Sequence, residues 1–150
     1  MVQFVTEVPE ISMDGFQVVS GEMFVRLPRK NEPTCTLWYN SICFGKMAMM
    51  ALNNCERIRI EVNVQARKIL IIPVSVKDKD NVRWITTGKN PQPRKIDCKT
   101  FTSQLYDAWG FNKDLNYRAY GRVVAADKKV MMLFDFTTPE TWKSRTPVKE

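Results

Sequence analysis

The sequence predicts an α+β protein in which two pseudo-repeated strand–helix–hairpin units form a compact antiparallel β-barrel-like core with two short helices. Apolar residues occupy every second position from Ile58 to Val64, as in a half-buried strand. The order strand, short helix, strand, turn, strand occurs in 42–74 and again in 96–136. Of the 150 residues, 44% are hydrophobic and 11% aromatic, which is enough apolar material for a core.

Residues 1–33 are predicted to be an acidic N-terminal leader with a short hairpin. Two β-rich runs, Phe16–Val19 and Met23–Leu27, are separated by the turn signal Ser20-Gly21. The polar loop that follows, 28–33, begins and ends with proline, which argues against a helix or a central strand there.

The first unit is predicted over residues 34–74. A strand at Thr34–Tyr39, a turn and a short strand at Ile42–Phe44 lead into a helix at Lys46–Asn53. The helix should end at its asparagine pair, because asparagine tolerates the left-handed C-cap conformation, and Met49 should be exposed. The residues expected on the core side of this helix are Met47, Met50 and Ala51.

A hairpin completes the first unit. Its first arm is the alternating strand Ile58–Val64, and its second arm is Ile69–Val74 after a short turn. Residues 75–93 are rich in charged residues, Asn, Gly and Pro, and they are predicted to be a linker with a short strand at Val82–Thr86.

The second unit, 94–136, is predicted to repeat this plan. A short strand at Lys95–Cys98 precedes a helix at Thr100–Trp109, with Asp97 as the N-cap and Gly110 as the terminating residue. The apolar face expected for this helix comprises Phe101, Leu105, Ala108 and Trp109.

The hairpin of the second unit is predicted to run from Leu115–Val124 through a turn at Ala126–Lys129 to Val130–Phe136. Residues 137–150 are expected to form a flexible tail. The segment 34–136 is therefore expected to be one compact domain.

The stretches Ile42–Val74 and Ile96–Phe136 resemble the swapped-hairpin DNA-binding modules of the AbrB/MazE class of prokaryotic regulators. In that family a strand leads to a short helix, a hairpin follows, and two copies interlace into a small barrel. The resemblance implies that this chain carries both copies in one polypeptide. The sequence departs from the family where each helix begins, because the residues there include no proline. The overall character is also similar to small proteins of phages and mobile elements of Gram-positive bacteria.

The charge is asymmetric. The net charge is +7, yet residues 1–22 hold four of the 16 acidic residues and none of the 23 basic ones, which leaves 23 basic against 12 acidic residues, or +11, in the rest. This pattern favours an anionic partner. The alternative is that excess lysine only keeps a small protein soluble.

Two sets of candidate nucleic-acid-binding residues follow. The resemblance implies that basic residues before and at the start of each helix face DNA, where a helix N-terminus already favours phosphate. That set is Arg26, Arg29, Lys30, Lys46, Arg94, Lys95 and Lys99. The second set consists of basic residues on the exposed faces of the two predicted hairpins, together with Tyr120, which could stack on a base. That set is Arg57, Arg59, Arg67, Lys68, Arg118, Tyr120, Arg122, Lys128 and Lys129. The alternative for both sets is an ordinary solvated surface that protects strand edges.

Several function classes are disfavoured. There is no histidine, and no nucleotide-binding or hydrolase motif is present, so we expect no enzyme, no metal and no cofactor. The four cysteines, which lack paired spacing, are expected to be buried reduced thiols. The N-terminus has no early basic residue and the apolar runs are short, so we expect a cytoplasmic protein without a membrane partner.

The first functional hypothesis is therefore a nucleic-acid-binding accessory or regulatory protein of a phage or mobile element, with DNA as the expected partner. The alternative is a protein-binding inhibitor that acts on a host protein through an apolar patch with Met49 or Trp142. An enzyme comes third.

Overall fold

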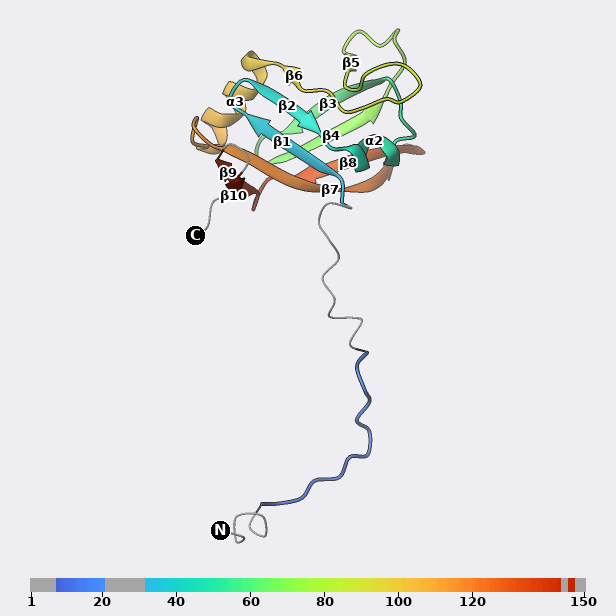
Figure 1. Ribbon diagram of the computed structural model, residues 1–150, viewed down its shortest axis with the longest axis vertical. Helices are drawn as coiled ribbons and strands as arrows, with labels where there is room; N and C mark the ends of the chain where they lie inside the picture. Colours follow the sequence, from blue (N-terminus) through green and yellow to red (C-terminus); the bar gives the residue numbers. More distant parts are fainter. Residues whose placement is uncertain (1–7, 21–31, 144–145, 148–150) are drawn as a thin grey trace.

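The first two strands of the structure, β1 (Thr34–Trp38) and β2 (Ser41–Phe44), form an antiparallel hairpin (Figure 1). The computed structural model describes residues 8–20, 32–143 and 146–147. Strands β1 and β2 pair as the sequence predicts. Alternation turns one face of this hairpin to the core, where four side chains are at most 1% exposed. They are Cys35, Leu37, Ile42 and Phe44.

Helix α2 (Lys46–Ala51) is short, and its buried face differs from the prediction. Met49 is only 2% exposed and Met50 is 51% exposed, so the expected exposure of Met49 is wrong. A helix of six residues fits the apolar spacing in more than one rotation, and here Ala48, Met49 and Leu52 contact the core. The chain leaves the helix through Asn53 and Asn54, both in the left-handed conformation (φ 57° and 54°).

The second hairpin pairs β3 (Arg57–Asn63) with β4 (Lys68–Pro73). Strand β5 (Val82–Arg83) pairs with β3 and is shorter than the predicted strand. The next residues belong to the core, because Trp84 is 1% exposed and its Nε1 donates a hydrogen bond to the Cys55 carbonyl (2.6 Å). The segment expected to be a linker therefore contributes to the packing.

Strand β6 (Ile96–Asp97) pairs with β2 and leads into α3 (Lys99–Trp109). Gly110 caps α3 in the left-handed conformation (φ 67°), as predicted. The N-cap residue is Cys98, which makes no side-chain capping bond, so the predicted cap at Asp97 is wrong.

The buried face of α3 is rotated from the predicted one. Ala108 is exposed and Phe101 is only half-buried, whereas two hydroxyl residues face the core. Both hydroxyls are hydrogen-bonded, because Thr102 Oγ1 donates to the Tyr39 carbonyl (2.9 Å) and Tyr106 Oη lies 3.0 Å from the Leu37 carbonyl. The buried residues of α3 are Thr102, Leu105, Tyr106 and Trp109.

Strand β7 (Asn116–Ala126) is 11 residues long and connects the two parts of the sheet. Its first half pairs with β1 on one side and with β9 (Glu140–Lys143) on the other. Its second half pairs with β8 (Lys129–Asp135). Strand β10 (Thr146–Pro147) pairs with β9, so the predicted tail adds strands to the sheet.

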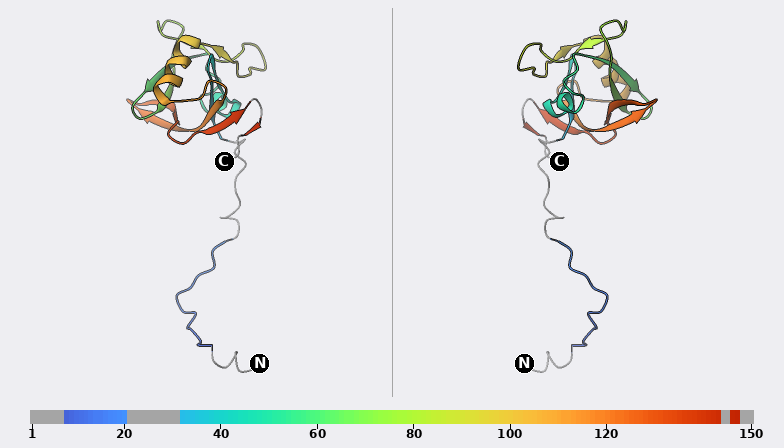
Figure 2. Two further views of the ribbon diagram at one scale, coloured as in Figure 1. Left: turned by 90° about the vertical axis from the view of Figure 1, so that its left-hand side faces the viewer. Right: turned by 90° about the vertical axis from the view of Figure 1, so that its right-hand side faces the viewer.

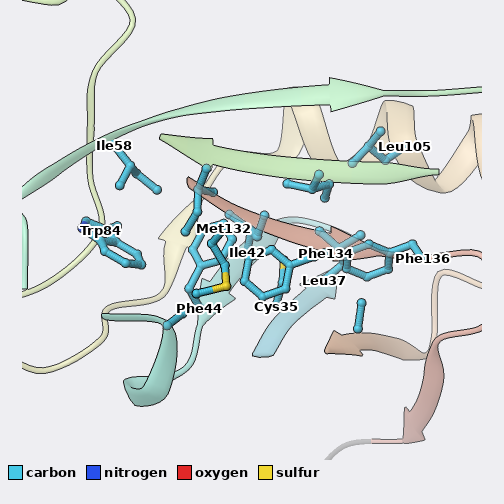
Figure 3. Close-up of a cluster of buried hydrophobic side chains, with 14 of the residues drawn as sticks. Cys35, Leu37, Ile42, Phe44, Ile58, Trp84, Leu105, Met132, Phe134 and Phe136 are labelled. Carbon is cyan, nitrogen blue, oxygen red and sulfur yellow. The ribbon is translucent and has the colours of Figure 1, made fainter. Parts of the chain in front are cut away.

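The fold is α+β, with a mostly antiparallel sheet that curls into a half-barrel and two helices (Figure 2). The strand order is β5-β3-β4-β8-β7-β1-β2-β6, and the strand pairs among the described residues are antiparallel. The core fills the inside of the curl, between the β3–β4 hairpin and the β1–β2 hairpin (Figure 3).

The leader differs from its prediction where it is described. Phe16–Val19 forms no strand, and Phe16 and Val18 are 68% and 99% exposed. The β-rich composition of this run is not enough to make a strand, because a strand needs a pairing partner. Met23–Leu27 lies outside the described residues, as do Arg26, Arg29 and Lys30. Within the described residues, no helix is long and apolar enough to cross a membrane.

Candidate nucleic-acid interface

Cationic and aromatic side chains gather on the convex side of the sheet. Thr36 lies opposite Arg118 of β7 and opposite Cys43 of β2. Because side chains alternate along a strand, these residues point away from Cys35 and Leu37, which are in the core. We call the side of β9, β7, β1, β2 and β6 that points away from the core the outer face; β1 and β2 lie toward the viewer in Figure 1.

Two tryptophans on the outer face each have a basic side chain over the ring. The Nζ atom of Lys95 lies 4.3 Å from the ring centroid of Trp38. The guanidinium carbon of Arg118 lies 4.5 Å from the ring centroid of Trp142, and its Nε donates a hydrogen bond to Thr36 Oγ1 (3.1 Å). Cation–π contacts of this kind attract a positive charge to a ring face, and Arg118 in addition lies opposite Glu140 of β9 in the strand register.

A third ring lies at the turn between β1 and β2. The Nζ atoms of Lys99 and Lys113 lie 5.9 Å and 5.2 Å from the Tyr39 ring centroid. Tyr39 packs edge-on against Tyr106, which fixes it to α3. Lys113 was not predicted as a site residue, because only the folded loop after α3 brings it to this ring.

Two buried polar atoms lie in one row of the outer face. Within the described part of the chain, Ser41 Oγ and Trp142 Nε1 are the buried side-chain polar atoms without a hydrogen-bond partner. Trp142 lies opposite Asn116, and Ser41 lies opposite Trp38. Tyr117 pairs with Leu37, so Asn116 and Trp38 are the next pair in the β7–β1 register. Trp142, Asn116, Trp38 and Ser41 therefore form one row across the four neighbouring strands β9, β7, β1 and β2. Such atoms are rare in folded proteins.

The other predicted residues of β7 lie beside this row. Tyr120 is half-buried, and its hydroxyl donates a hydrogen bond to Glu140 Oε1 (2.7 Å). Arg122 is exposed and lines a cavity of about 430 Å³ with Tyr120 and Asp135. A hydrogen bond from the Thr137 hydroxyl is the main cause that lowers the pKa of Asp135, and the charges of Lys68 and Arg122 add to it.

The arginines of β3 have acidic or amide partners close by. Arg59 forms ion pairs with Glu61 (2.9 Å) and Asp78 (2.8 Å), and Arg57 donates to Asn81 Oδ1 (3.1 Å). The backbone N–H of Asp80 and then Arg59 lower the pKa of Asp78. Strands β4 and β8 separate β3 from β7. The arginines of the two strands are therefore about 14 Å or more apart, three strand spacings, and form no common cluster.

The remaining predicted cations are spread over the molecule. Because Lys68 lies opposite Asp135 in the antiparallel β4–β8 pair, the tips of the two long hairpins point to opposite ends of the sheet. Arg67 and Lys68 lie at one tip, and Lys128 and Lys129 at the other. Lys46 is exposed at the start of α2, and the Nη1 atom of Arg94 donates to the Arg83 carbonyl (3.3 Å).

The described residues include no group of three or more side chains that could hold a metal ion. All four cysteines are free thiols, and burial raises the pKa of each. The outer face therefore offers two cations, Lys95 and Arg118, beside two tryptophan rings. Comparison with protein-family models, with curated proteins and with solved structures finds no match for this chain.

Proposed function

We propose that this protein binds nucleic acid through the outer face, as an accessory or regulatory protein. The observation that carries the proposal is that Lys95 and Arg118 each lie over a tryptophan ring on the outer face, with Lys99 and Lys113 over the Tyr39 ring at the adjoining β1–β2 turn. Lysine and arginine gain free energy from counterion release at a polyanion, and aromatic rings add stacking on bases.

The charge balance supports the same proposal. From residue 23 onward the chain holds 23 basic and 12 acidic residues, since four of the 16 acidic ones precede that point. The positive field of such a body raises the rate of encounter with a polyanion. The cations at the rings have aromatic partners, whereas the cation on β3 has two carboxylate partners. The outer face is thus the better candidate for phosphate contact.

We also propose that the two units are an internal duplication that resembles a fused swapped-hairpin dimer. The support is the pairing of equivalent strands: β4 of the first unit pairs with β8 of the second, and β2 pairs with β6. Both pairs are antiparallel, as strands related by a two-fold axis would be. The helices differ in length, with six residues in α2 and 11 in α3.

The test of the function is a fluorescence-polarisation titration with labelled DNA and RNA at about 50 and 200 mM salt. We expect affinity to fall steeply between the two salt concentrations. Lys95→Gln should weaken binding and lower the slope of log K against log salt by about 1. Arg118→Lys should keep more affinity than Arg118→Gln, because it preserves the charge.

The matched control is Lys79→Gln, which removes an exposed lysine in the loop after β4, away from the outer face. This variant should bind like the unchanged protein. Absence of binding to every nucleic acid at about 50 mM salt would contradict the proposed function.

A further inference from the structure

We infer that the outer face takes single-stranded nucleic acid in preference to a duplex, with unpaired bases stacked beside Trp38 and Trp142. The inference rests on the proposed function and names its class of ligand. It comes from the different surroundings of the four tryptophans.

Two of the tryptophans are core residues with satisfied polar atoms. Trp84 and Trp109 are 1% and 4% exposed. Their Nε1 atoms donate to the carbonyls of Cys55 (2.6 Å) and Val64 (2.9 Å). Packing alone explains these rings.

The other two tryptophans, Trp38 and Trp142, differ from these core residues in burial, in position and in the groups around their rings. Trp38 and Trp142 are only partly buried, they lie on the side of the sheet away from the core, and each has a cation over its ring. Among the described residues, neither Trp142 Nε1 nor Ser41 Oγ in the same row has a hydrogen-bond partner. Packing does not require a cation, a partly exposed ring and an unsatisfied donor at one place.

The chemistry of the row fits unpaired bases. In a duplex, base faces stack on one another and only base edges reach the grooves, so ring faces on a protein have nothing to stack on. Single strands expose base faces, and proteins bind them by stacking on aromatic rings or on arginine planes that lie on an open sheet. The outer face provides both kinds of group, because the guanidinium carbon of Arg118 lies 4.5 Å from the centroid of the Trp142 ring.

The spacing of the groups also fits a strand that crosses the sheet. Only β7 lies between β9, which carries Trp142, and β1, which carries Trp38. Two strand spacings put the backbones of Trp38 and Trp142 roughly 10 Å apart, with Arg118 on the strand between them.

The experiment compares one DNA sequence as a single strand, as a duplex and as the corresponding RNA strand, at about 50 mM salt. The readouts are polarisation of the labelled nucleic acid and tryptophan fluorescence of the protein. We expect tighter binding of the single strands and quenching on binding. Trp38→Leu and Trp142→Leu should each lower single-strand affinity about tenfold, whereas Trp38→Phe should retain most of it.

The matched control is Phe16→Leu, which removes an aromatic ring that is 68% exposed and lies outside the outer face. It should leave the affinity unchanged. Circular dichroism and thermal unfolding establish that each variant folds, and Lys95→Gln tests the same face without a change in any ring.

The outcomes separate the two proposals. Equal or tighter duplex binding, with no quenching and no effect of the tryptophan variants, overturns the single-strand inference and leaves the proposed function in place. No binding to any of the three nucleic acids overturns both. A preference for single strands that is lost with Trp38 or Trp142 supports both.

Discussion

At Gly121 the backbone of β7 passes too close to a neighbouring ring for any side chain. A Cβ atom at this position would lie 2.5 Å from Cε1 and 2.7 Å from Cδ1 of Phe134. Gly121 is opposite Phe134 in the β7–β8 register, and its N–H donates to the Pro33 carbonyl (2.9 Å). The glycine thus lies where β7 passes from its pairing with β1 to its pairing with β8.

We predict that Gly121→Ala lowers the free energy of unfolding by about 2 kcal/mol, because the added methyl group overpacks a core ring. Urea unfolding measures the change. Val123→Ala is the control on the same strand, where the side chain is 52% exposed, and it should cost less than about 0.5 kcal/mol. Equal stabilities of the two variants would show that Phe134 moves away freely.

The contacts of the candidate site could not be predicted from local sequence. Arg118 and Thr36 are 82 residues apart in the chain, and Lys95 reaches Trp38 from another strand. The sequence does predict Lys95, Lys99 and Arg118 as basic candidates, because charge is visible without a fold. It does not indicate that rings lie beneath them, since the strand register decides which ring each cation meets.

At the scale of the element, the β7–β8 turn has a backbone that one of its two central residues, Lys128, does not favour. Asp127 and Lys128 both have positive φ angles (51° and 64°), as in a type I′ turn. Ala126 and Lys129 close the turn as paired residues. Lysine gains nothing from this conformation, whereas glycine adopts it without strain.

We predict that the double substitution Asp127→Asn and Lys128→Gly raises the free energy of unfolding by about 1 kcal/mol, because Asn-Gly is the favoured type I′ pair. Lys128→Val should lower it, since a β-branched residue resists positive φ. Thermal unfolding of both variants provides the comparison. A loss of stability in the Asn-Gly variant would contradict the turn assignment.

Elements with regular alternation or clear caps were predictable, and elements that depend on distant partners were not. The β3–β4 hairpin and the end of α3 at Gly110 follow from local pattern. Strand β9 was missed because its four residues form a strand only against β7. The face of α3 was rotated because Tyr106 and Thr102 count as polar in a sequence pattern, although carbonyls in the core accept their hydroxyls.

At the scale of the whole molecule, the fold keeps its four thiols protonated. Cys35 is fully buried, the other three are half-buried, and burial is the main cause that raises the pKa of each. The thiolate is the reactive form, so the folded protein should react slowly with thiol reagents.

We predict that a thiol-specific reagent at about pH 8 modifies the native protein more slowly than the urea-unfolded protein, with Cys35 slowest. A raised pKa in the folded state also means that the unfolded chain loses its thiol protons first. The contribution of the thiols to stability should therefore be constant below about pH 8.5 and fall as the pH rises further. Replacing Cys35 with alanine should reduce this fall. Rapid labelling of all four thiols in the native protein would contradict the burial.

The pairing of β4 with β8 has a consequence for the order in which the protein is made. During synthesis the β3–β4 hairpin leaves the ribosome well before β7 and β8 do. Strand β1 is likewise made long before β7, the strand with which it pairs. Until the last third of the chain emerges, two strand edges stay open to wrong partners. The half-barrel can close only after β7 and β8 have been made, and the two strands that are left open until then, β4 (KILIIP) and β1 (TCTLW), have one charged residue between them to discourage wrong pairing.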